Sequence, residues 1–426
     1  MFQTIVNAFK LKDVRKKILI TIALLFIYRL GCYIPVPGVT MFNGLSDFNF
    51  LEIMNGVSGG ALSQGTFFAM GIGPYINASI IIQLLSVGIP ALERLSKQGE
   101  EGKRKLNAYT RILTLVLAIA QAIGIVVGFG IDTNAVFGST PFLSFLSHAF
   151  VVIVYTAGAA LTMWIGERIT DYGVSNGISL LIFAGILSTA GSSIITVGKG
   201  LFVPATAMNS VWTLVGFVIA AILIFAAITA VNDAERKITV QYAKQVKGRK
   251  MYGGQSTHIP MKVNSSGVMP LIFSYAILSL PDLIMNLVGV KENWWTQNMG
   301  TGSWPYTVVL CVFILFFSYF YNQIQFNPDD VSKSIQGNGG FIPGIRPGKP
   351  TADYLKKISN RITLFGAIFL AIIALVPSLI FRGVGGGALI NVFSATGLLI
   401  IVSVALEFEQ ALQSQIMMKN YKGFLK

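Results

Sequence analysis

Long runs of apolar residues, separated by short polar segments, occupy most of the chain. A helix needs roughly 20 residues to cross a lipid bilayer, and these runs approach or reach that length. Gly and Pro residues inside them are tolerable in a packed bundle, where neighbouring helices satisfy the freed backbone groups. The pattern therefore predicts ten membrane-spanning helices, at residues 18–34, 73–89, 112–129, 150–165, 179–197, 211–231, 267–288, 306–324, 362–381 and 389–406.

The composition supports this interpretation. Hydrophobic residues make up 53% of the 426 residues, charged residues make up only 12%, and the mean hydropathy is +0.67. A soluble domain carries about twice that charged fraction. We therefore expect an all-α integral membrane protein. Its first apolar run continues into IPVPG (34–38) without a small-residue cleavage site, which indicates a retained span rather than a cleaved signal peptide.

The basic residues predict how the spans are oriented. All but four of the 32 Lys and Arg residues lie in the N-terminal segment, the second, fourth, sixth and eighth loops, or the C-terminal tail. Of the exceptions, Lys199, Lys291 and Arg382 fall on the opposite side, and Arg29 lies inside the first span. Positive loops stay in the cytoplasm, so both termini are expected there, as an even number of spans also requires. The net charge of +14 on that side favours acidic partners such as lipid headgroups, a cytosolic protein or ribosomal RNA.

Few residues in the spans carry chemistry. Cys32 and Cys311 show no metal or redox spacing, and His148 and His258 are far apart, so neither a disulfide nor a metal site is expected. Ion-coupled transporters usually place carboxylates or histidines at mid-membrane, where the predicted spans are aliphatic. Arg29 is interpreted as a side chain that either reaches the interface or forms an internal hydrogen-bonded strut.

One segment comes close to a nucleotide-binding loop without matching it. In GIRPGKPT (344–351) the glycines are one residue too close together, and Pro350 follows Lys349. The phosphate-binding pattern G-x-x-x-x-G-K-[ST] must also open a helix after a strand. We therefore expect no nucleotide or other cofactor, no enzymatic activity, and an energy source supplied by another protein.

A shorter apolar segment lies between the first two predicted spans. Residues 59–70 are too short to cross the membrane and rich in Gly and Ser, and the charge pattern puts them on the non-cytoplasmic side. Irregular backbone at membrane depth is tolerated only where it is buried in protein or lines an aqueous cavity. A re-entrant element is favoured over an ordinary external loop, with Gly71, Gly73 and Pro74 forming a break before the second span.

Seven motifs in the loops and span ends are more specific than the hydropathy pattern. They are YRLGCYIPVPG (28–38), GGALSQGTFFAMGIGPYINASIIIQLL (59–85), QGEEGKRKLNAYTR (98–111), WIGERITDYGVSNGISLLIFAGI (164–186), RKITVQYAK (236–244), GGQSTHIPMKVNSSGVMPLIF (253–273) and FIPGIRPGKPT (341–351). Together they resemble the SecY family, whose members are the central subunit of the bacterial Sec translocon. The similarity runs from about residue 10 to NYKGF (420–424).

The resemblance implies two pseudo-symmetric halves, residues 1–200 and 201–426, hinged around an hourglass pore. It implies that unfolded secretory chains cross through the centre, while apolar segments leave sideways between the second, third, seventh and eighth spans. In this family a short plug helix closes the pore, and it falls at about residues 57–67, on the re-entrant segment. The matching plug residues are Val57, Gly59, Gly60, Ala61, Leu62 and Phe67.

The pore ring of the family falls on six isoleucines. Four of them form two pairs spaced four residues apart, so that each pair shares one helix face. Spacing alone favours core packing for both pairs, whereas the resemblance favours a ring of branched aliphatic side chains that forms an apolar gasket. Hydrophobic constrictions can also gate by dewetting. The ring residues are Ile72, Ile76, Ile178, Ile182, Ile272 and Ile400.

Two further sets of positions match the family. Asn77 and Gln121 correspond to polar positions of the lateral gate. Arg249 and Lys250, in the sixth loop (about 232–264), and Arg346, in the eighth (about 326–361), correspond to tips that dock a motor ATPase or the ribosome. Solvated charge without a partner is the alternative for such loops. The Gly and Pro residues around Arg346 favour a fixed shape that presents one guanidinium for bidentate contact.

The sequence leads to one favoured function and two alternatives. We expect a protein-conducting channel in the bacterial plasma membrane that works with the SecE and SecG small membrane subunits, the SecA motor ATPase or the ribosome, membrane lipids, and secretory precursors carrying signal sequences. A secondary transporter is disfavoured by the aliphatic spans and large basic loops, and no small-molecule substrate is expected. A membrane scaffold that conducts nothing would leave the re-entrant segment unexplained.

Overall fold

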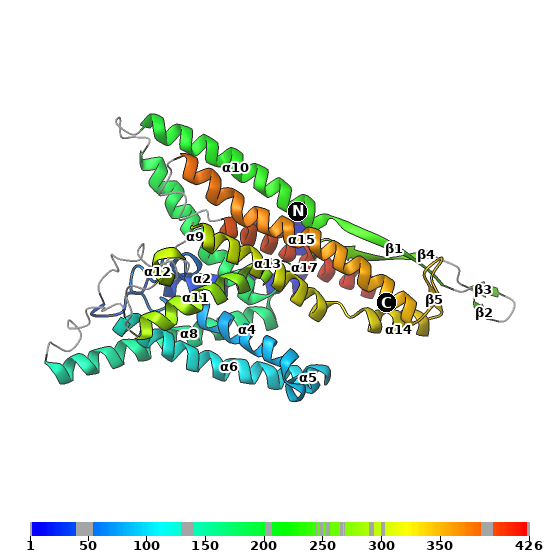
Figure 1. Ribbon diagram of the computed structural model, residues 1–426, viewed down its shortest axis with the longest axis horizontal. Coiled ribbons are helices and arrows are strands. Elements are labelled where there is room, and N and C mark those ends of the chain that lie inside the picture. Colours follow the sequence, from blue (N-terminus) through cyan, green and yellow to red (C-terminus); the bar gives the residue numbers. More distant parts are fainter. Residues whose placement is uncertain are drawn as a thin grey trace.

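The computed structural model describes residues 2–39, 54–128, 140–200, 207–242, 245–247, 250–252, 256–264, 267, 269–288, 294–299, 303–384 and 395–423. In this part the chain forms a bundle of long helices, many of which run close to the long axis of the molecule (Figure 1). A narrow ribbon of strands projects from one end of the bundle (Figure 1).

The helices and strands follow in chain order. Before residue 201 they are α1 Phe2–Lys10, α2 Lys12–Gly31, α4 Gly73–Gly88, α5 Pro90–Lys97, α6 Glu100–Ile123, the π-helical turn η2 Gly124–Gly128, α8 Pro141–Tyr172 and α9 Gly177–Gly200. After it the helices are α10 Ala207–Asp233, α11 Met269–Val288, α12 Trp294–Asn298, α13 Trp304–Gln325, α14 Pro328–Gly337, α15 Lys349–Val384 and α17 Ala395–Gly423. The strands are β1 Glu235–Tyr242, β2 Gln245–Lys247, β3 Lys250–Tyr252, β4 Ser256–Lys262 and β5 Gly340–Phe341.

Each predicted span overlaps one long helix, and the ten-span prediction is consistent with the structure. Among the described residues, four helical stretches are long and apolar enough to cross a membrane, and the bent pair α4–α5 is a fifth candidate. Shorter apolar stretches, Gly177–Ser192, Ile222–Asp233 and Met269–Leu278, lie in α9, α10 and α11.

Local sequence explains where several helices begin. Pro74 stands in the first turn of α4, where its missing N–H costs no hydrogen bond. Ser303 and Asn327 cap α13 and α14, their side-chain oxygens accepting hydrogen bonds from the backbone N–H groups of Tyr306 and Asp329. α15 begins at Lys349, well before the predicted span, because hydropathy does not detect its polar first turns.

Part of the sixth and eighth loops forms a small sheet, which an expectation of helices alone did not include. β1 pairs antiparallel with β4, and β5 pairs with the other edge of β1. Side chains alternate along β1, so that Ile238 and Val240 are buried in a cluster with Ile335 of α14 and Leu355 of α15. The two loops therefore form one folded unit.

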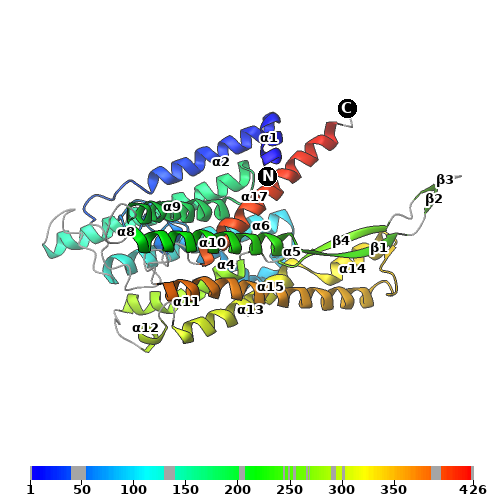
Figure 2. The same cartoon turned by 90° about the horizontal axis from the view of Figure 1, so that it is seen from above.

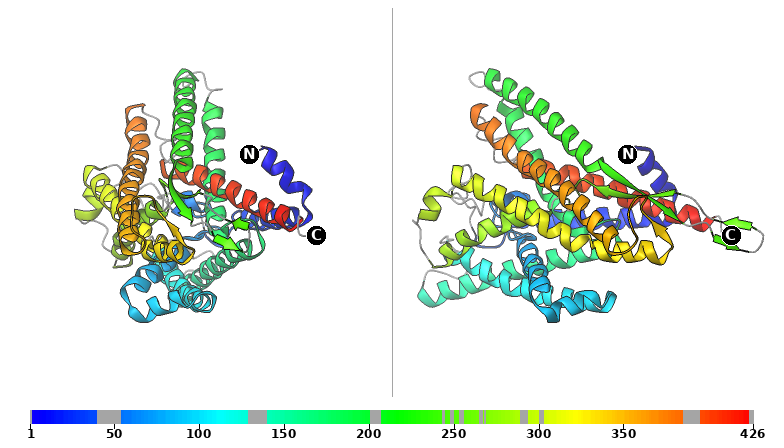
Figure 3. Two further views of the ribbon diagram at one scale, coloured as in Figure 1. Left: turned by 90° about the vertical axis from the view of Figure 1, so that its right-hand side faces the viewer. Right: turned by 45° about the vertical axis from the view of Figure 1, so that its right-hand side comes forward.

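The strand ribbon, α5, α14 and both ends of the chain lie toward the same end of the bundle (Figures 2 and 3). The charge pattern assigns all of these segments to the cytoplasm, so the structure agrees with the predicted grouping of loops. That this end faces the cytoplasm stays a prediction from the basic residues.

Contacts between helices fall into two connected groups. One contains α2, α4, α6, α8 and α9, and the other contains α10, α11, α13, α15 and α17. Between the groups, α17 and α10 pack against α9, while α11 packs against α4 and η2. The division of the chain at about residue 200 stays a prediction, and this arrangement is compatible with it.

Candidate functional site

The six isoleucines predicted to form a ring belong to one apolar cluster, although they come from distant parts of the chain. Ile72, Ile182 and Ile400 are buried in it, and the other three are partly buried and pack against it. They are carried by the N-terminus of α4, by α9, by the first turn of α11 and by α17. The structure therefore brings together residues from both predicted halves.

Gly166 of α8 shows how closely two of these side chains approach. A Cβ atom placed on Gly166 would lie 3.5 Å from Cγ1 of Ile178 and 3.6 Å from Cδ1 of Ile72. Both isoleucines thus point toward the same spot on α8. Branched aliphatic side chains offer no hydrogen-bonding group, so the cluster can exclude water without recognising a particular sequence.

The re-entrant segment packs against this cluster from inside the bundle. Ala61 and Leu62 are 1% and 0% exposed, Ser58 and Thr66 are buried, and Phe67 is partly buried. The interpretation as a re-entrant element, rather than an external loop, agrees with this burial.

The expected plug helix over 57–67 needs a correction. Within the described residues the helix covers only 54–57, and turns continue to residue 72. Gly59, Gly60 and Gly65 take φ angles of 72°, 86° and 59°, in the left-handed region that interrupts a right-handed helix. The segment is therefore a compact set of turns.

Three glycines on neighbouring helices make room for the segment. A Cβ atom on Gly185 of α9 would overlap the carbonyl oxygen of Val57, and one on Gly158 of α8 would overlap that of Phe67. A Cβ atom on Gly31 of α2 would overlap the ring of Phe68. Glycine is needed at these three positions because the backbone or the Phe68 ring of the re-entrant segment lies against the helix backbone there. A sequence pattern does not reveal such contacts.

Arg29 of α2 is bound to the re-entrant segment. Its Nη1 donates a hydrogen bond of 3.0 Å to the carbonyl oxygen of Gly59, and its Nη2 donates one of 2.9 Å to the hydroxyl of Tyr33. The guanidinium also lies 4.6 Å from the centre of the Tyr33 ring, within range of a cation–π interaction. Of the two interpretations of Arg29, the internal hydrogen-bonded strut is confirmed.

Other hydrogen bonds hold the same segment. The amide N–H of Ser63 donates to Oδ1 of Asn55 at 2.9 Å, which closes the turn on itself. The hydroxyl of Thr189 on α9 donates to the carbonyl oxygen of Gly56 at 3.2 Å. Most side-chain contacts from the rest of the bundle therefore end on backbone carbonyls of the segment.

The two predicted gate residues lie on adjacent helices. Asn77 of α4 and Gln121 of α6 are 9% and 2% exposed. The side-chain oxygen of Gln121 is buried without a hydrogen-bond partner among the described atoms, an arrangement that destabilises the packed state. Directly after it, α6 widens into the π-helical turn η2, which packs against α11. π-helical turns occur frequently at functional sites.

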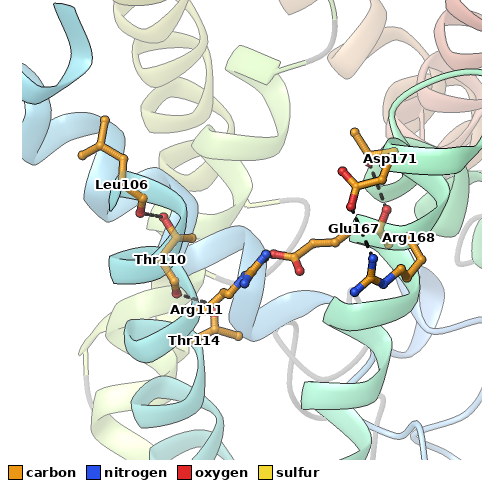
Figure 4. Close-up of polar contacts among 9 residues, drawn as sticks. Leu106, Thr110, Arg111, Thr114, Glu167, Arg168 and Asp171 are labelled. Carbon is orange, nitrogen blue, oxygen red and sulfur yellow. Dashed lines mark hydrogen bonds and ion pairs between the residues drawn. The ribbon is translucent and has the colours of Figure 1, made fainter. Parts of the chain in front are cut away.

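An ion pair joins two helices of the first group (Figure 4). Nε of Arg111 on α6 lies 2.7 Å from Oε1 of Glu167 on α8 (Figure 4). Tyr75 of α4, which packs against the isoleucine cluster, interacts electrostatically with both charges. The pair connects α6 to α8 beside Tyr75, and because the Arg111 side chain is 53% exposed it contributes little to stability by itself.

The structure describes two of the three predicted docking residues, Lys250 and Arg346. Arg346 is exposed in the turn between β5 and α15, and its carbonyl oxygen accepts a 2.8 Å hydrogen bond from the hydroxyl of Thr351. Gly344 and Gly348 on either side have φ angles of 82° and 95°, which fix the turn. Lys250 begins β3, and Arg249 lies outside the described residues.

Sequence reasoning missed several residues of the site. Gly31 and Gly185 lie within family motifs, but nothing in those motifs indicated a contact with the re-entrant segment, and Gly158 lies outside them. Gln83 and Tyr321, which join α4 to α13 by a hydrogen bond, lie 238 positions apart and share no motif. Long apolar helices packed around a buried re-entrant segment define a multi-pass membrane protein of the kind that forms channels.

The chain belongs to the SecY family, since residues 66–409 match the SecY family model. Relatives named protein translocase subunit SecY include that of Streptomyces galbus, 43% identical over 445 residues and 100% of both chains. That of Corynebacterium glutamicum is 42% identical over 99% of both chains, and that of Mycobacterium bovis is 40% identical over 100% of both.

Solved structures have the same fold. One, a protein conducting channel, aligns with a TM-score of 0.69 at 19% identity, covering 94% of this chain and 92% of that chain. Sec61 in a canine ribosome–channel complex from the endoplasmic reticulum gives a TM-score of 0.63 at 18% identity, over 94% and 92%. The fold is thus that of the SecY and Sec61 channels.

Proposed function

We propose that this chain is the channel through which unfolded secretory polypeptides cross the bacterial plasma membrane, with transmembrane segments released sideways into the bilayer. The observation that carries the proposal is that all six isoleucines belong to, or pack against, one apolar core cluster that also includes Ala61 and Phe68 of the re-entrant segment. The relatives' name, protein translocase subunit, supports the same function.

In the resting state, two seals act in series. The isoleucine ring excludes water and ions because it offers them no polar contact. The segment at 54–72 fills the space beside the ring and is fixed by Arg29 and by the small residues of α8 and α9. An entering polypeptide displaces this plug, and the flexible aliphatic side chains then close around the extended chain.

The lateral exit lies between α4 and α6 on one side and α11 and α13 on the other. Asn77 and Gln121 weaken the apolar contact between these helices, and the buried side-chain oxygen of Gln121, which has no partner among the described atoms, further destabilises the closed state. A sufficiently apolar signal segment replaces these contacts and passes into the lipid.

The energy comes from partners, and the chain itself is not an enzyme. We assign docking of the SecA motor or the ribosome to the cytoplasmic end that carries Arg249, Lys250 and Arg346. Structures of Sec61 and of yeast Ssh1 in complexes with ribosomes support the second of these partners. SecE and SecG are the small membrane subunits expected beside the bundle, and both termini face the cytoplasm.

Reconstitution tests the proposed function directly. The purified chain with its small partner subunits is placed in liposomes and supplied with SecA, ATP and a precursor carrying a strong signal sequence. We expect precursor to become protected from added protease only when ATP is present. Absence of protected precursor from a correctly folded complex would overturn the proposed function.

The ring makes a second, independent prediction. Changing Ile72, Ile178 and Ile272 together to Ser removes one buried and two partly buried apolar side chains, each worth at most about 1.5–3 kcal/mol, and hydrates the constriction. We expect resting ion conductance in planar bilayers, and a larger conductance when residues 57–67 are also deleted. Ile18→Ser, in an apolar cluster with Val14 and Leu412 that includes neither the ring nor the re-entrant segment, is the control and should lower stability without conductance. A folded but silent triple variant would contradict the ring.

A further inference from the structure

An apolar seam joins the two groups of helices beside the ring. Ile80 of α4 is buried in one cluster with Phe273 of α11 and with Phe317 and Tyr321 of α13. Ile76, a ring residue, packs against the same cluster. The seam therefore begins at the ring and follows α4 along the line where α11 and α13 meet it.

A hydrogen bond between Tyr321 of α13 and Gln83 of α4 crosses this seam. The hydroxyl of Tyr321 donates to Oε1 of Gln83 over 2.8 Å, and the two residues are separated by 238 positions. A second side-chain hydrogen bond between the halves, from Gln415 of α17 to the carbonyl oxygen of Val174, lies in a different region, beside α1. Of these two bonds, only the first would have to break when α4 separates from α13.

Neighbouring side chains hold the ring of Tyr321 in one orientation. Its ring packs edge-on against Phe273 at a centroid distance of 5.1 Å, and the residue is only 8% exposed. With the ring held in this way, its hydroxyl has little freedom to find another acceptor. The hydrogen bond is therefore a defined feature of the closed seam rather than one of many exchanging surface contacts.

Gln83 lies toward the predicted cytoplasmic end of the seam. It follows Ile76 by seven residues on α4, a distance of about 10 Å along the helix. α4 then ends at Gly88, and the chain bends by 102° into α5. A segment that enters from the cytoplasmic end meets this bond before it meets the ring.

We infer that the Tyr321–Gln83 hydrogen bond is a latch across the lateral exit that sets how apolar a signal segment must be to open it. This inference rests on the proposed function. An apolar segment entering the seam recovers the packing energy of α4 against α11 and α13, but it offers no replacement for the hydrogen bond. A weakly apolar signal therefore fails where a strongly apolar one succeeds.

The physical chemistry of buried polar pairs gives the latch a distinctive signature. Gln83→Leu leaves the hydroxyl of Tyr321, a residue only 8% exposed, without its acceptor in the closed seam, whereas in the open seam water satisfies it; Tyr321→Phe removes the same hydrogen bond from the closed seam and leaves the partly buried Gln83. Either single change therefore favours opening. Replacing both partners by apolar side chains removes the unsatisfied group, and the seam closes again almost as well as before.

The test measures transport of two precursors that differ only in signal hydrophobicity, using the reconstituted complex of full-length chains. The readout is the ratio of weak-signal to strong-signal transport. We expect Tyr321→Phe and Gln83→Leu each to raise this ratio about threefold, the size typical of one hydrogen bond in a membrane protein. The double variant should return toward the wild-type ratio.

Tyr319→Phe is the matched control. Its hydroxyl donates to the carbonyl oxygen of Asn360 over 3.4 Å, which joins α13 to α15 within one half and not across the seam. Its ratio should equal that of the wild type. An unchanged ratio in Tyr321→Phe, an equal rise in Tyr319→Phe, or a double variant equal to the product of the singles would overturn the latch alone. Failure of the wild type to transport even the strong signal would instead overturn the proposed function, and the latch with it.

Discussion

Arg29 shows how one side chain links a membrane span to a functional segment. An arginine inside an apolar run is costly unless its charge reaches water or hydrogen-bond partners. Here the guanidinium is held between Tyr33, one turn along the same helix, and the carbonyl oxygen of Gly59 in the plug. Gly59 has a φ of 72°, which turns this carbonyl toward α2 in a conformation that other residues rarely adopt.

Loss of this strut should loosen the plug. In Arg29→Leu, the carbonyl oxygen of Gly59 loses a hydrogen bond from a charged donor, and such bonds contribute about 1.5–3 kcal/mol. The displaced plug should become at least tenfold more populated at rest. We expect brief ion-conducting openings in planar bilayers, while transport of precursors with strong signals continues.

Tyr33→Phe provides the comparison for this variant. It removes the second partner of Arg29 but leaves both the bond to Gly59 and the aromatic ring. Its resting conductance should stay close to that of the wild type. Equal conductance in the two variants would show that the bond to Gly59 does not hold the plug.

At the scale of elements, the re-entrant plug segment packs closely on its neighbouring helices because glycines on those helices leave room for it. Gly158 and Gly185 let the carbonyl oxygens of Phe67 and Val57 approach the backbones of α8 and α9 directly. In an ordinary helix these glycines would be unfavourable by about 1 kcal/mol each relative to Ala. Their presence is explained by the close approach.

Gly185→Ala should therefore displace the plug segment without destabilising α9. The new methyl group occupies the place of the Val57 carbonyl, so the plug is displaced although α9 itself becomes a better helix. We expect resting ion conductance together with an unchanged or slightly raised thermal stability. Gly191→Ala, on the same helix with open space around it, should give the stability effect without conductance. A Gly185→Ala channel without resting ion conductance would show that the contact between Gly185 and Val57 does not hold the plug.

At the scale of the whole molecule, the basic end of the bundle is a single folded unit. β5 of the eighth loop pairs with β1 of the sixth, and a shared apolar cluster fixes both loops on α14 and α15. Arg346 is exposed on this unit, with the turn around it fixed by Gly344 and Gly348. A partner that binds one loop is thereby placed against the other.

Reversing one charge on this unit should prevent motor-driven transport. Arg346→Glu replaces the exposed guanidinium by a carboxylate and repels an acidic docking surface, whereas the bundle is untouched because the turn lies outside it. We expect loss of SecA-dependent precursor protection with normal folding and membrane insertion. Lys333→Glu, the same charge change at an exposed position of α14, should transport nearly normally. Normal transport by Arg346→Glu at physiological salt would exclude the docking role.

The sequence by itself determined the class of the protein and much of its plan. Hydropathy marked the runs that became helices, since crossing a bilayer requires about 20 consecutive apolar residues whatever surrounds them. The charge pattern grouped the loops that the structure places toward one end of the bundle. Length and composition also marked the re-entrant segment, because twelve residues rich in Gly and Ser cannot cross. Family motifs, not spacing, favour a ring over core packing for the two isoleucine pairs, and this assignment stays a prediction.

The tertiary structure alone decided which distant residues meet. It turned the expected plug helix into turns, because three glycines take left-handed φ angles there. It decided that Gly185 faces Val57 and that Tyr321 reaches Gln83, and it paired the strands of two separate loops. Hydropathy is a property of each residue and its neighbours in sequence, whereas these contacts depend on how helices far apart in the chain are rotated and stacked. Between apolar helices many rotations bury similar area, so single glycines and hydrogen bonds, which no periodicity reveals, select the one that forms.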